Sequence, residues 1–258
     1  MSSVLFTISK GVGFITLNRP EKLNSINHEM ALLLKEKLDE CASDVSVRAV
    51  YITGTGKGFC TGQDLEEAVN AGDESFDDTL SKFYNPIVMA IRSLQKPIVA
   101  AVNGVAAGAG ANIALCCDIV VAAQSASFIQ AFSKIGLVPD SGGTHTLPRL
   151  IGWQKASALM LLAEKVPAQE AMNMGMIYKV IPDESFADES VKIVSRLAQM
   201  PTKGLALTKE ALQSSLQKTL EEQLHVEDLF QRQAARTHDF KEGIAAFLAK
   251  RQPLFTGE

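Results

Sequence analysis

The most apolar part of the chain, residues 97–123, limits the possible folds more than any other segment. It contains two strand-like runs, PIVAAVNG and DIVVAA, and the sequence GAGANIALCC between them predicts a short helix. Glycine and polar residues interrupt the segment too often for a membrane span; they are Gly104, Gly108, Gly110, Asn112 and Asp118. A buried strand, a helix and a second buried strand in succession predict an α/β fold.

Further strands precede this segment, and helices follow it. The runs VLFTI and GFITLNRP predict a β-hairpin that turns at residues 9–13, and VRAVYITG predicts another buried strand. Asn27 is expected to cap the helix of NHEMALLLKEKLDECA, and MIYKVI is one more predicted strand. The later helices are predicted at 154–163, 168–174, 184–199, 202–217, 219–236 and 239–250. No Gly/Pro/Ser-rich linker divides the chain, so we expect one α/β core with a helical C-terminal extension.

Composition excludes several classes of partner. The net charge of −4 disfavours nucleic acid and anionic membranes, because both favour a basic surface. The N-terminal residues contain no basic stretch followed by an apolar one, so we expect no signal peptide. Four cysteines show neither a CxxC pair nor disulfide-like spacing. We therefore expect a cytoplasmic protein.

Several segments resemble motifs of other enzyme classes, but each lacks a residue that the motif requires. TGTGKGF at 53–59 lacks the hydroxyl residue that must follow the lysine of a phosphate-binding loop. NGVAAGAG at 103–110 has the glycine spacing of short-chain dehydrogenases, but no tyrosine is followed four residues later by a lysine. The four histidines form no HxxxH or HExxH pattern, so no zinc site is expected. PDSGG is not the Gly-x-Ser-x-Gly of a hydrolase.

Three glycine-rich segments, 58–65, 104–112 and 136–144, offer what enolate chemistry requires. Two converging backbone N–H groups can stabilise an oxyanion, and a positioned carboxylate can move protons. The third segment contains Asp140, which either caps a helix or acts as an acid–base group. Capping would lower its pKa, whereas apolar surroundings would raise it. The apolar residues expected around it are Phe132, Leu137 and Val138.

Longer motifs identify a family. RPEKLNSIN, GKGFCTGQDL, KPIVAAVNGVAAGAGANIALCCDIVVAA, FSKIGLVPDSGGTHTLPRLIG and DFKEGIAAFLAKRQPLF together resemble the crotonase (enoyl-CoA hydratase/isomerase) superfamily over essentially the whole chain. The resemblance implies an α/β spiral of ββα units over residues 1–200 that binds an acyl-CoA. It also implies a helical oligomerisation region over residues 201–258, which forms a homotrimer or a dimer of trimers.

The resemblance also implies site residues. The oxyanion donors fall on the N–H groups of Gln63 and Ala109. Residues expected to contact the CoA moiety are Lys22, Leu23, Ser25, Gln63, Asp64 and Leu65. Phe247 and Lys250 are expected to approach the CoA of a neighbouring subunit. No metal or separate cofactor is expected, because the CoA arrives as part of the substrate.

Two departures from the family pattern predict the reaction. Hydratases hold a water between two glutamates, and this chain has Asn112 and Phe132 at those positions. Asp140 stands where several isomerase branches have an acid, and GLVPDSGGT resembles the 1,2-epoxyphenylacetyl-CoA isomerase (oxepin-CoA forming) branch in particular. We therefore expect an acyl-CoA isomerase with Asp140 as its single proton shuttle. The alternatives are a Δ3,Δ2-enoyl-CoA isomerase of fatty-acid oxidation and a catalytically silent CoA-binding paralogue.

Overall fold

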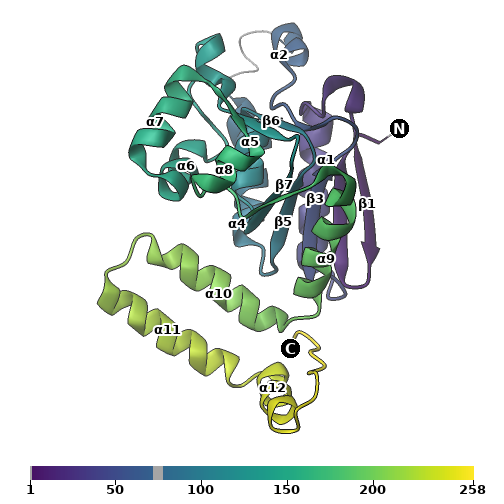
Figure 1. The fold of residues 1–258 in the computed structure, drawn as a ribbon, viewed down its shortest axis with the longest axis vertical. Helices are drawn as coiled ribbons and strands as arrows, with labels where there is room; N and C mark the ends of the chain where they lie inside the picture. The colour runs from purple at the N-terminus through teal and green to yellow at the C-terminus, as the bar shows by residue number, and fades with distance from the viewer. Residues whose placement is uncertain (1, 72–77) are drawn as a thin grey trace.

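The larger of two β-sheets runs through the centre of the computed structural model, which describes residues 2–71 and 78–258 (Figure 1). Its strands, in spatial order, are β1 (Val4–Ser9), β2 (Val12–Leu17), β3 (Ala49–Gly54), β5 (Ile98–Val102), β7 (Ile119–Ala123) and β10 (Lys179–Ile181). β1 and β2 form the predicted antiparallel hairpin. All other neighbours in this sheet are parallel, as expected where helices connect the strands.

The second sheet has four short strands and is the part of the fold that positions the site. They are β4 (Gly58–Cys60), β6 (Val105–Ala107), β8 (Ser127–Ile129) and β9 (Lys165–Pro167), in that spatial order. The chain enters the two sheets alternately: β3 then β4, β5 then β6, β7 then β8. Each unit therefore places one strand in each sheet, and the expected spiral of ββα units is confirmed.

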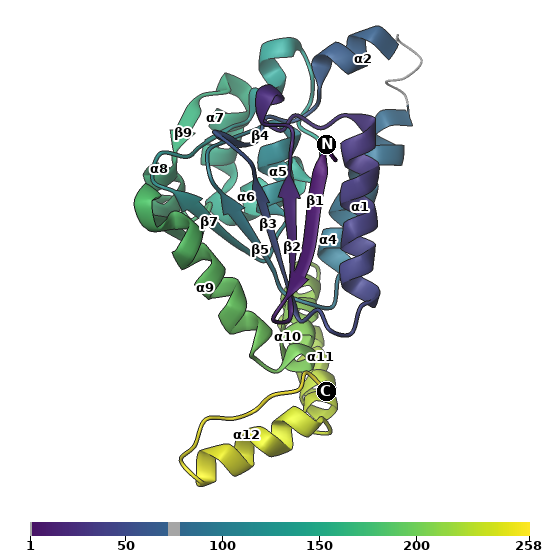
Figure 2. The same cartoon turned by 90° about the vertical axis from the view of Figure 1, so that its right-hand side faces the viewer.

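Helices cover both faces of the large sheet. α1 (His28–Ser43) and α4 (Asn85–Ser93) lie on one side and α9 (Phe186–Ala198) on the other (Figure 2). The remaining core helices are α2 (Leu65–Ala71), α5 (Ala109–Leu115), α6 (Gly143–Ile151), α7 (Trp153–Leu162) and α8 (Ala168–Asn173). The predicted cap of α1 is confirmed, because Asn27 Oδ1 accepts a hydrogen bond from the Met30 N–H.

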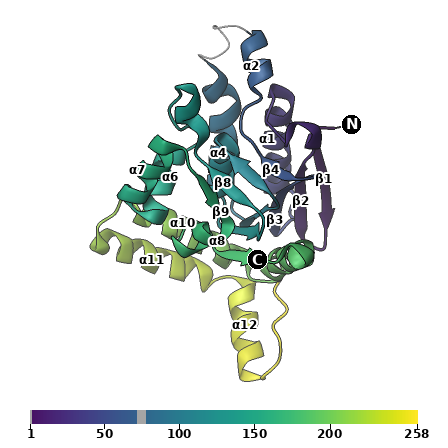
Figure 3. The ribbon, with the colours of Figure 1, turned by 45° about the horizontal axis from the view of Figure 1, so that its top comes forward.

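Three C-terminal helices extend from one end of the core: α10 (Thr202–Ser215), α11 (Leu220–Ala234) and α12 (His238–Leu248). α10 is attached by a partly buried ion pair, since Lys209 Nζ lies 2.9 Å from Asp118 Oδ2. α12 projects away from the rest of the chain (Figure 3). The boundary at residue 200 between the acyl-CoA-binding core and the oligomerisation region stays a prediction. Within the described ranges, no helix is both long and apolar enough to cross a membrane.

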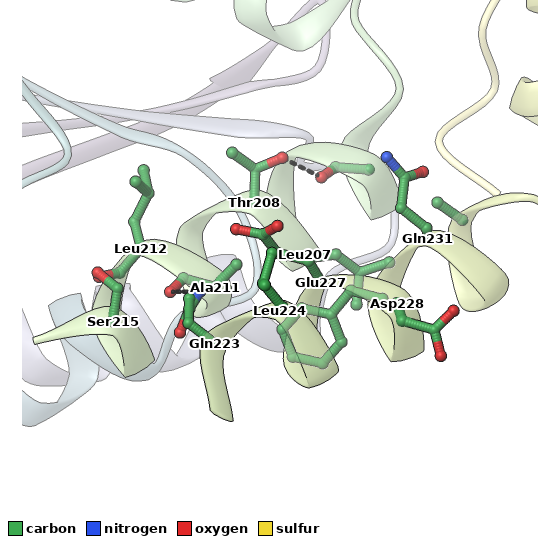
Figure 4. Close-up of a pocket in the computed structure, with 13 residues that line it drawn as sticks. Leu207, Thr208, Ala211, Leu212, Ser215, Gln223, Leu224, Glu227, Asp228 and Gln231 are labelled. Carbon is green, nitrogen blue, oxygen red and sulfur yellow. Dashed lines mark hydrogen bonds between the residues drawn. The ribbon is translucent and has the colours of Figure 1, made fainter. Parts of the chain in front are cut away.

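Side chains of α10 and α11 border an open groove of about 560 Å³, which Figure 4 shows. Apolar residues line much of it, including Leu207, Leu212 and Leu224. Large apolar side chains are also exposed along α12; they include Phe240, Ile244, Phe247 and Leu248. The C-terminal helices therefore present apolar side chains on the surface of the single chain.

Candidate active site

The main-chain segment that follows β4 lies beside the one that follows β6, and it also pairs with Ile26. Ile26 N–H donates to the Gly62 carbonyl at 2.7 Å, and Asp64 N–H donates to the Ile26 carbonyl at 2.9 Å. This parallel bridge leaves the N–H of Gln63 pointing away from Ile26. Gly62 has φ +89°, and a Cβ there would lie 3.2 Å from the Ala109 nitrogen. The two segments that carry the expected oxyanion donors are therefore adjacent.

Neither of these two donors is used internally. Ala109 begins α5, where helix geometry provides no acceptor for its N–H. Across residues 2–71 and 78–258, neither the Gln63 N–H nor the Ala109 N–H donates a hydrogen bond. Gly108 enters the helix at φ 52° and ψ −129°, a conformation that favours glycine. Two neighbouring free N–H groups can together stabilise a developing oxyanion.

Asp140 does not cap a helix. The residue that precedes α6 is Gly142, and no side chain among residues 2–71 and 78–258 caps this helix. Ser141 (φ 49°) and Gly142 (φ 76°) are both left-handed, and this turn separates the Asp140 side chain from the start of α6. The main-chain carbonyl of Asp140, rather than its carboxylate, accepts the Gly143 N–H at 2.9 Å. The capping alternative is therefore wrong.

The Asp140 carboxyl is left in an environment that favours its protonated form. Within the described part of the chain, its buried Oδ1 has no hydrogen-bond partner. Burial raises the pKa of the carboxyl, and the adjacent Ser141 hydroxyl opposes part of that increase without completing a hydrogen bond. A carboxyl with a raised pKa is better matched to both accepting and returning a proton near neutral pH.

The apolar surroundings of Asp140 differ from the expectation. Phe132 is buried, and its ring Cζ is 3.8 Å from the place of a Cβ on Gly108, so it lies beside the residue that precedes Ala109. Leu137 and Val138 are instead 36% and 77% exposed. These two residues extend along the surface loop, because the 3-10 turn before Gly136 ends with that residue in the left-handed region. They do not enclose the carboxyl in this chain.

Two buried amides connect the Asp140 loop to α5. Asn112 Nδ2 donates to the Asp140 carbonyl at 2.8 Å, and Asn112 Oδ1 accepts from Gln130 Nε2 at 2.8 Å. A Cβ on Gly143 would overlap the Asn112 amide, so these segments pack without space for a side chain. Both positions where hydratases have glutamate, 112 and 132, are thus at the site and uncharged. Sequence reasoning missed Gln130, which no motif singled out.

The predicted CoA-contacting residues lie on two segments, 22–25 and 63–65, which are connected by side-chain hydrogen bonds. Arg19 joins them, because its guanidinium donates to the Ser25 carbonyl and to Asp64 Oδ2, at 2.6 and 2.7 Å. Lys22 pairs with Glu66 at 2.6 Å, next to the exposed Leu65. Leu23 is 40% exposed, whereas the side chain of Ser25 is mostly buried. The Asp64 carboxylate is committed to Arg19, and sequence reasoning had not identified that arginine.

Phe247 and Lys250 are not brought to the site within one chain. Phe247 is 82% exposed near the end of α12, and Lys250 follows that helix. Figure 1 places α12 at the opposite end of the molecule from α2. A contact of these residues with CoA would therefore require a second copy of the chain.

Comparisons with known proteins agree with this geometry. The family model for enoyl-CoA hydratase/isomerase matches residues 7–258. The chain is 47% identical to the 1,2-epoxyphenylacetyl-CoA isomerase of Escherichia coli K12, with 100% of both chains covered. It is 43% identical to a Rhodobacter capsulatus protein named "Probable enoyl-CoA hydratase", which covers 99% of this chain and 98% of the relative.

A solved structure shows the same fold. The enoyl-CoA hydratase from Bacillus anthracis superposes with a TM-score of 0.95 at 31% identity, over 99% of this chain and 100% of that one. The expected resemblance is therefore confirmed by a family model, by full-length relatives and by the arrangement of the strands. The chain belongs to the enoyl-CoA hydratase/isomerase (crotonase) family.

Proposed function

We propose that this protein is an acyl-CoA isomerase that works through a thioester enolate, with Asp140 as its proton shuttle. The observation that carries the proposal is the Asp140 carboxyl itself, which is half-buried and has a raised pKa, and whose buried Oδ1 has no hydrogen-bond partner among the described residues. Asn112 ties the loop of Asp140 to the same helix that begins at Ala109. Neither residue 112 nor residue 132 offers a competing carboxylate.

The chemistry follows from three groups. The N–H groups of Gln63 and Ala109 hydrogen-bond the thioester oxygen and stabilise the negative charge that forms when a neighbouring carbon loses its proton. Asp140 accepts that proton and returns it to a different carbon, so the molecular formula is unchanged. Asn112 and Phe132 cannot activate water as a pair of glutamates would. Rearrangement is thereby favoured over hydration.

We propose 1,2-epoxyphenylacetyl-CoA as the main substrate, with oxepin-CoA as its product. The 47% identity to an enzyme of that name supports this choice, while the 43% relative bears a hydratase name. The ring carbon–carbon bond that carries the epoxide oxygen would break while both C–O bonds are kept, which gives a seven-membered ring. Asp140 would remove a proton beside the thioester and return it to a ring carbon, so that substrate and product are isomers. A Δ3,Δ2-enoyl-CoA isomerase uses the same groups on a linear chain.

The remaining assignments belong to the same proposal. The segment of Lys22, Leu23 and Ser25 would hold the CoA moiety together with residues 63–65. Phe247 and Lys250 would reach the CoA of another subunit in a trimer or a dimer of trimers. The substrate brings its own CoA, and we propose that the reaction uses no metal and no redox cofactor.

The decisive experiment offers purified enzyme three substrates separately: 1,2-epoxyphenylacetyl-CoA, a cis-3-enoyl-CoA and crotonyl-CoA. We expect the highest kcat/KM with the epoxide and slower double-bond migration in the 3-enoyl thioester. Hydration of crotonyl-CoA should be at least about 10²-fold slower, because no glutamate pair activates water. Preference for the 3-enoyl substrate would favour the fatty-acid alternative. Absence of turnover on all three would favour a silent paralogue.

A further inference from the structure

We propose that Asn112 and Gln130 form an amide relay that positions Asp140 for proton transfer. The inference deepens the proposed function and rests on it. Gln130 donates to Asn112, and Asn112 donates to the Asp140 carbonyl, each at 2.8 Å. Asn112 is fully buried and Gln130 is 4% exposed, so the relay is isolated from solvent.

The relay depends on one group that accepts and donates at once. Asn112 Oδ1 accepts from Gln130 while Nδ2 donates to residue 140, and an amide side chain of this length offers both functions without charge at any pH. The Asp140 carbonyl oxygen needs a donor, and this fixes the orientation of the Asn112 amide. If N and O of Asn112 were exchanged, Oδ1 would face the Asp140 carbonyl oxygen, and both atoms are acceptors. The position that carries a glutamate in hydratases thus has a positioning amide here.

The loop that the relay holds is conformationally unusual. Ser141 is a non-glycine residue at φ 49°, directly before Gly142 at φ 76°. Such a residue is disfavoured unless surrounding contacts hold it. The Asp140 carbonyl accepts from both Asn112 Nδ2 and the Gly143 N–H, which fixes the peptide immediately before this turn. The relay therefore holds the main chain from which the carboxyl projects, while Oδ1 stays free of protein partners in the described part of the chain.

The first test is Asn112→Leu, which keeps the branched shape of the side chain and removes both hydrogen bonds. We expect kcat to fall about 10²-fold, the effect of displacing a reacting group by about 1 Å. KM should change by less than about threefold, because the CoA-contacting segments lie elsewhere. Hydrogen exchange of the peptide covering residues 136–147 should become faster. Gln130→Met removes only the first bond and should lower kcat by a smaller factor.

A second variant, Asn112→Asp, provides a signature in pH. The carboxyl that it introduces can donate to the Asp140 carbonyl only while protonated. The kcat of the wild type should rise with pH and level off, whereas kcat of Asn112→Asp should fall again as the new carboxyl ionises. A role confined to stability would change the melting temperature without adding this alkaline decline.

Tyr51→Phe is the matched control, because it removes a buried hydrogen bond to Ser190 on the far side of the large sheet. It should lower stability and leave kcat within about twofold. Full turnover of Asn112→Leu beside an inactive Asp140→Asn would overturn the relay alone. Full turnover of Asp140→Asn would overturn the proposed function and, with it, the relay.

Discussion

The region around Asp140 and the C-terminal helices differ in what they leave unpaired. Near Asp140 the chain is closely packed, and the groups without partners in the described residues are polar: the N–H groups of Gln63 and Ala109, and the side-chain oxygens Asp140 Oδ1, Ser141 Oγ and Gln130 Oε1. Along α10–α12 the exposed groups are apolar, with Phe247 82% and Leu248 75% exposed. The first region is suited to chemistry on a small polar group, and the second is suited to burial against another surface.

This difference separates two kinds of mutational effect. Substitutions near Asp140 should change the rate of the chemical step and leave assembly intact. Substitutions on α12 should change assembly and substrate affinity and leave the chemical step largely intact. The four predictions below test that separation, beginning with the largest expected effect.

Asp140→Asn should abolish isomerase turnover, with a loss of about 10⁴-fold or more, because it removes the proposed proton shuttle. Folding raises the pKa of this carboxyl, so its ionisation at neutral pH costs stability. The amide of the variant carries no charge, and the melting temperature should therefore be equal or higher at neutral pH. That advantage should disappear below the ordinary aspartate pKa of 3.8. Retained turnover with a lower melting temperature would contradict the mechanism.

Ala109→Val should lower kcat by about 10²–10³-fold, the usual loss when one oxyanion donor is displaced. Ala109 is 3% exposed and lies beside Gly62, so added methyl groups displace the acyl group from the two N–H groups. Binding of free CoA, measured by calorimetry, should be little changed. Ala114→Val, a buried position on the same helix, controls for overpacking. Equal kcat in both variants would place the oxyanion site elsewhere.

Phe247→Ala should raise KM for acyl-CoA about tenfold with a small change in kcat, because a phenyl group buried against a neighbour contributes about 1.5–3 kcal/mol. Light scattering should give a trimer or hexamer for the wild type. Leu32→Ala, an exposed leucine on α1, is the control and should change neither quantity. A fully active wild-type monomer would remove the proposed role of the second subunit.

The smallest effect concerns pH. The apparent pKa of the acidic limb of the kcat/KM profile should lie above the ordinary aspartate value of 3.8, because burial raises the pKa of Asp140 and the carboxylate is the active base. Ser141 partly opposes that rise, so Ser141→Ala should move the limb upward by less than about one pH unit. Pre-steady-state rates measured across the acidic range would detect it. A downward shift would mean that the hydroxyl does not favour the ionised form.

Much of the large sheet could be predicted from sequence. Its strands β5 and β7 are continuous apolar runs, and Val120 and Val121 of the second run are buried as expected. The strands β4 and β6 were missed because each has three residues within a glycine-rich segment. Such short strands carry no periodicity and are defined by pairing with distant strands. The helix α6 was missed as well, in a segment with Pro148 inside it.

The site could be predicted in part. Family motifs placed the N–H groups of Gln63 and Ala109, and the structure brings their segments together. The sequence could not show whether Asp140 caps a helix or acts as an acid–base group, because this depends on the left-handed backbone conformation of Ser141. Gln130 and Arg19 were missed, since their roles arise from contacts across 18 and 45 positions of the chain.

The two N–H groups of the site have a consequence for how such a protein can diversify. They belong to the main chain at the ends of consecutive units, so only a change to proline removes them and only bulk can obstruct them. In the proposed mechanism, the groups that select the reaction are the side chains at 112, 132 and 140, and one or a few nucleotide changes can replace each of them. Activation of the thioester is therefore mutationally robust, while the fate of the resulting enolate is open to change. One ancestral scaffold can thus yield several reactions without rebuilding its binding site.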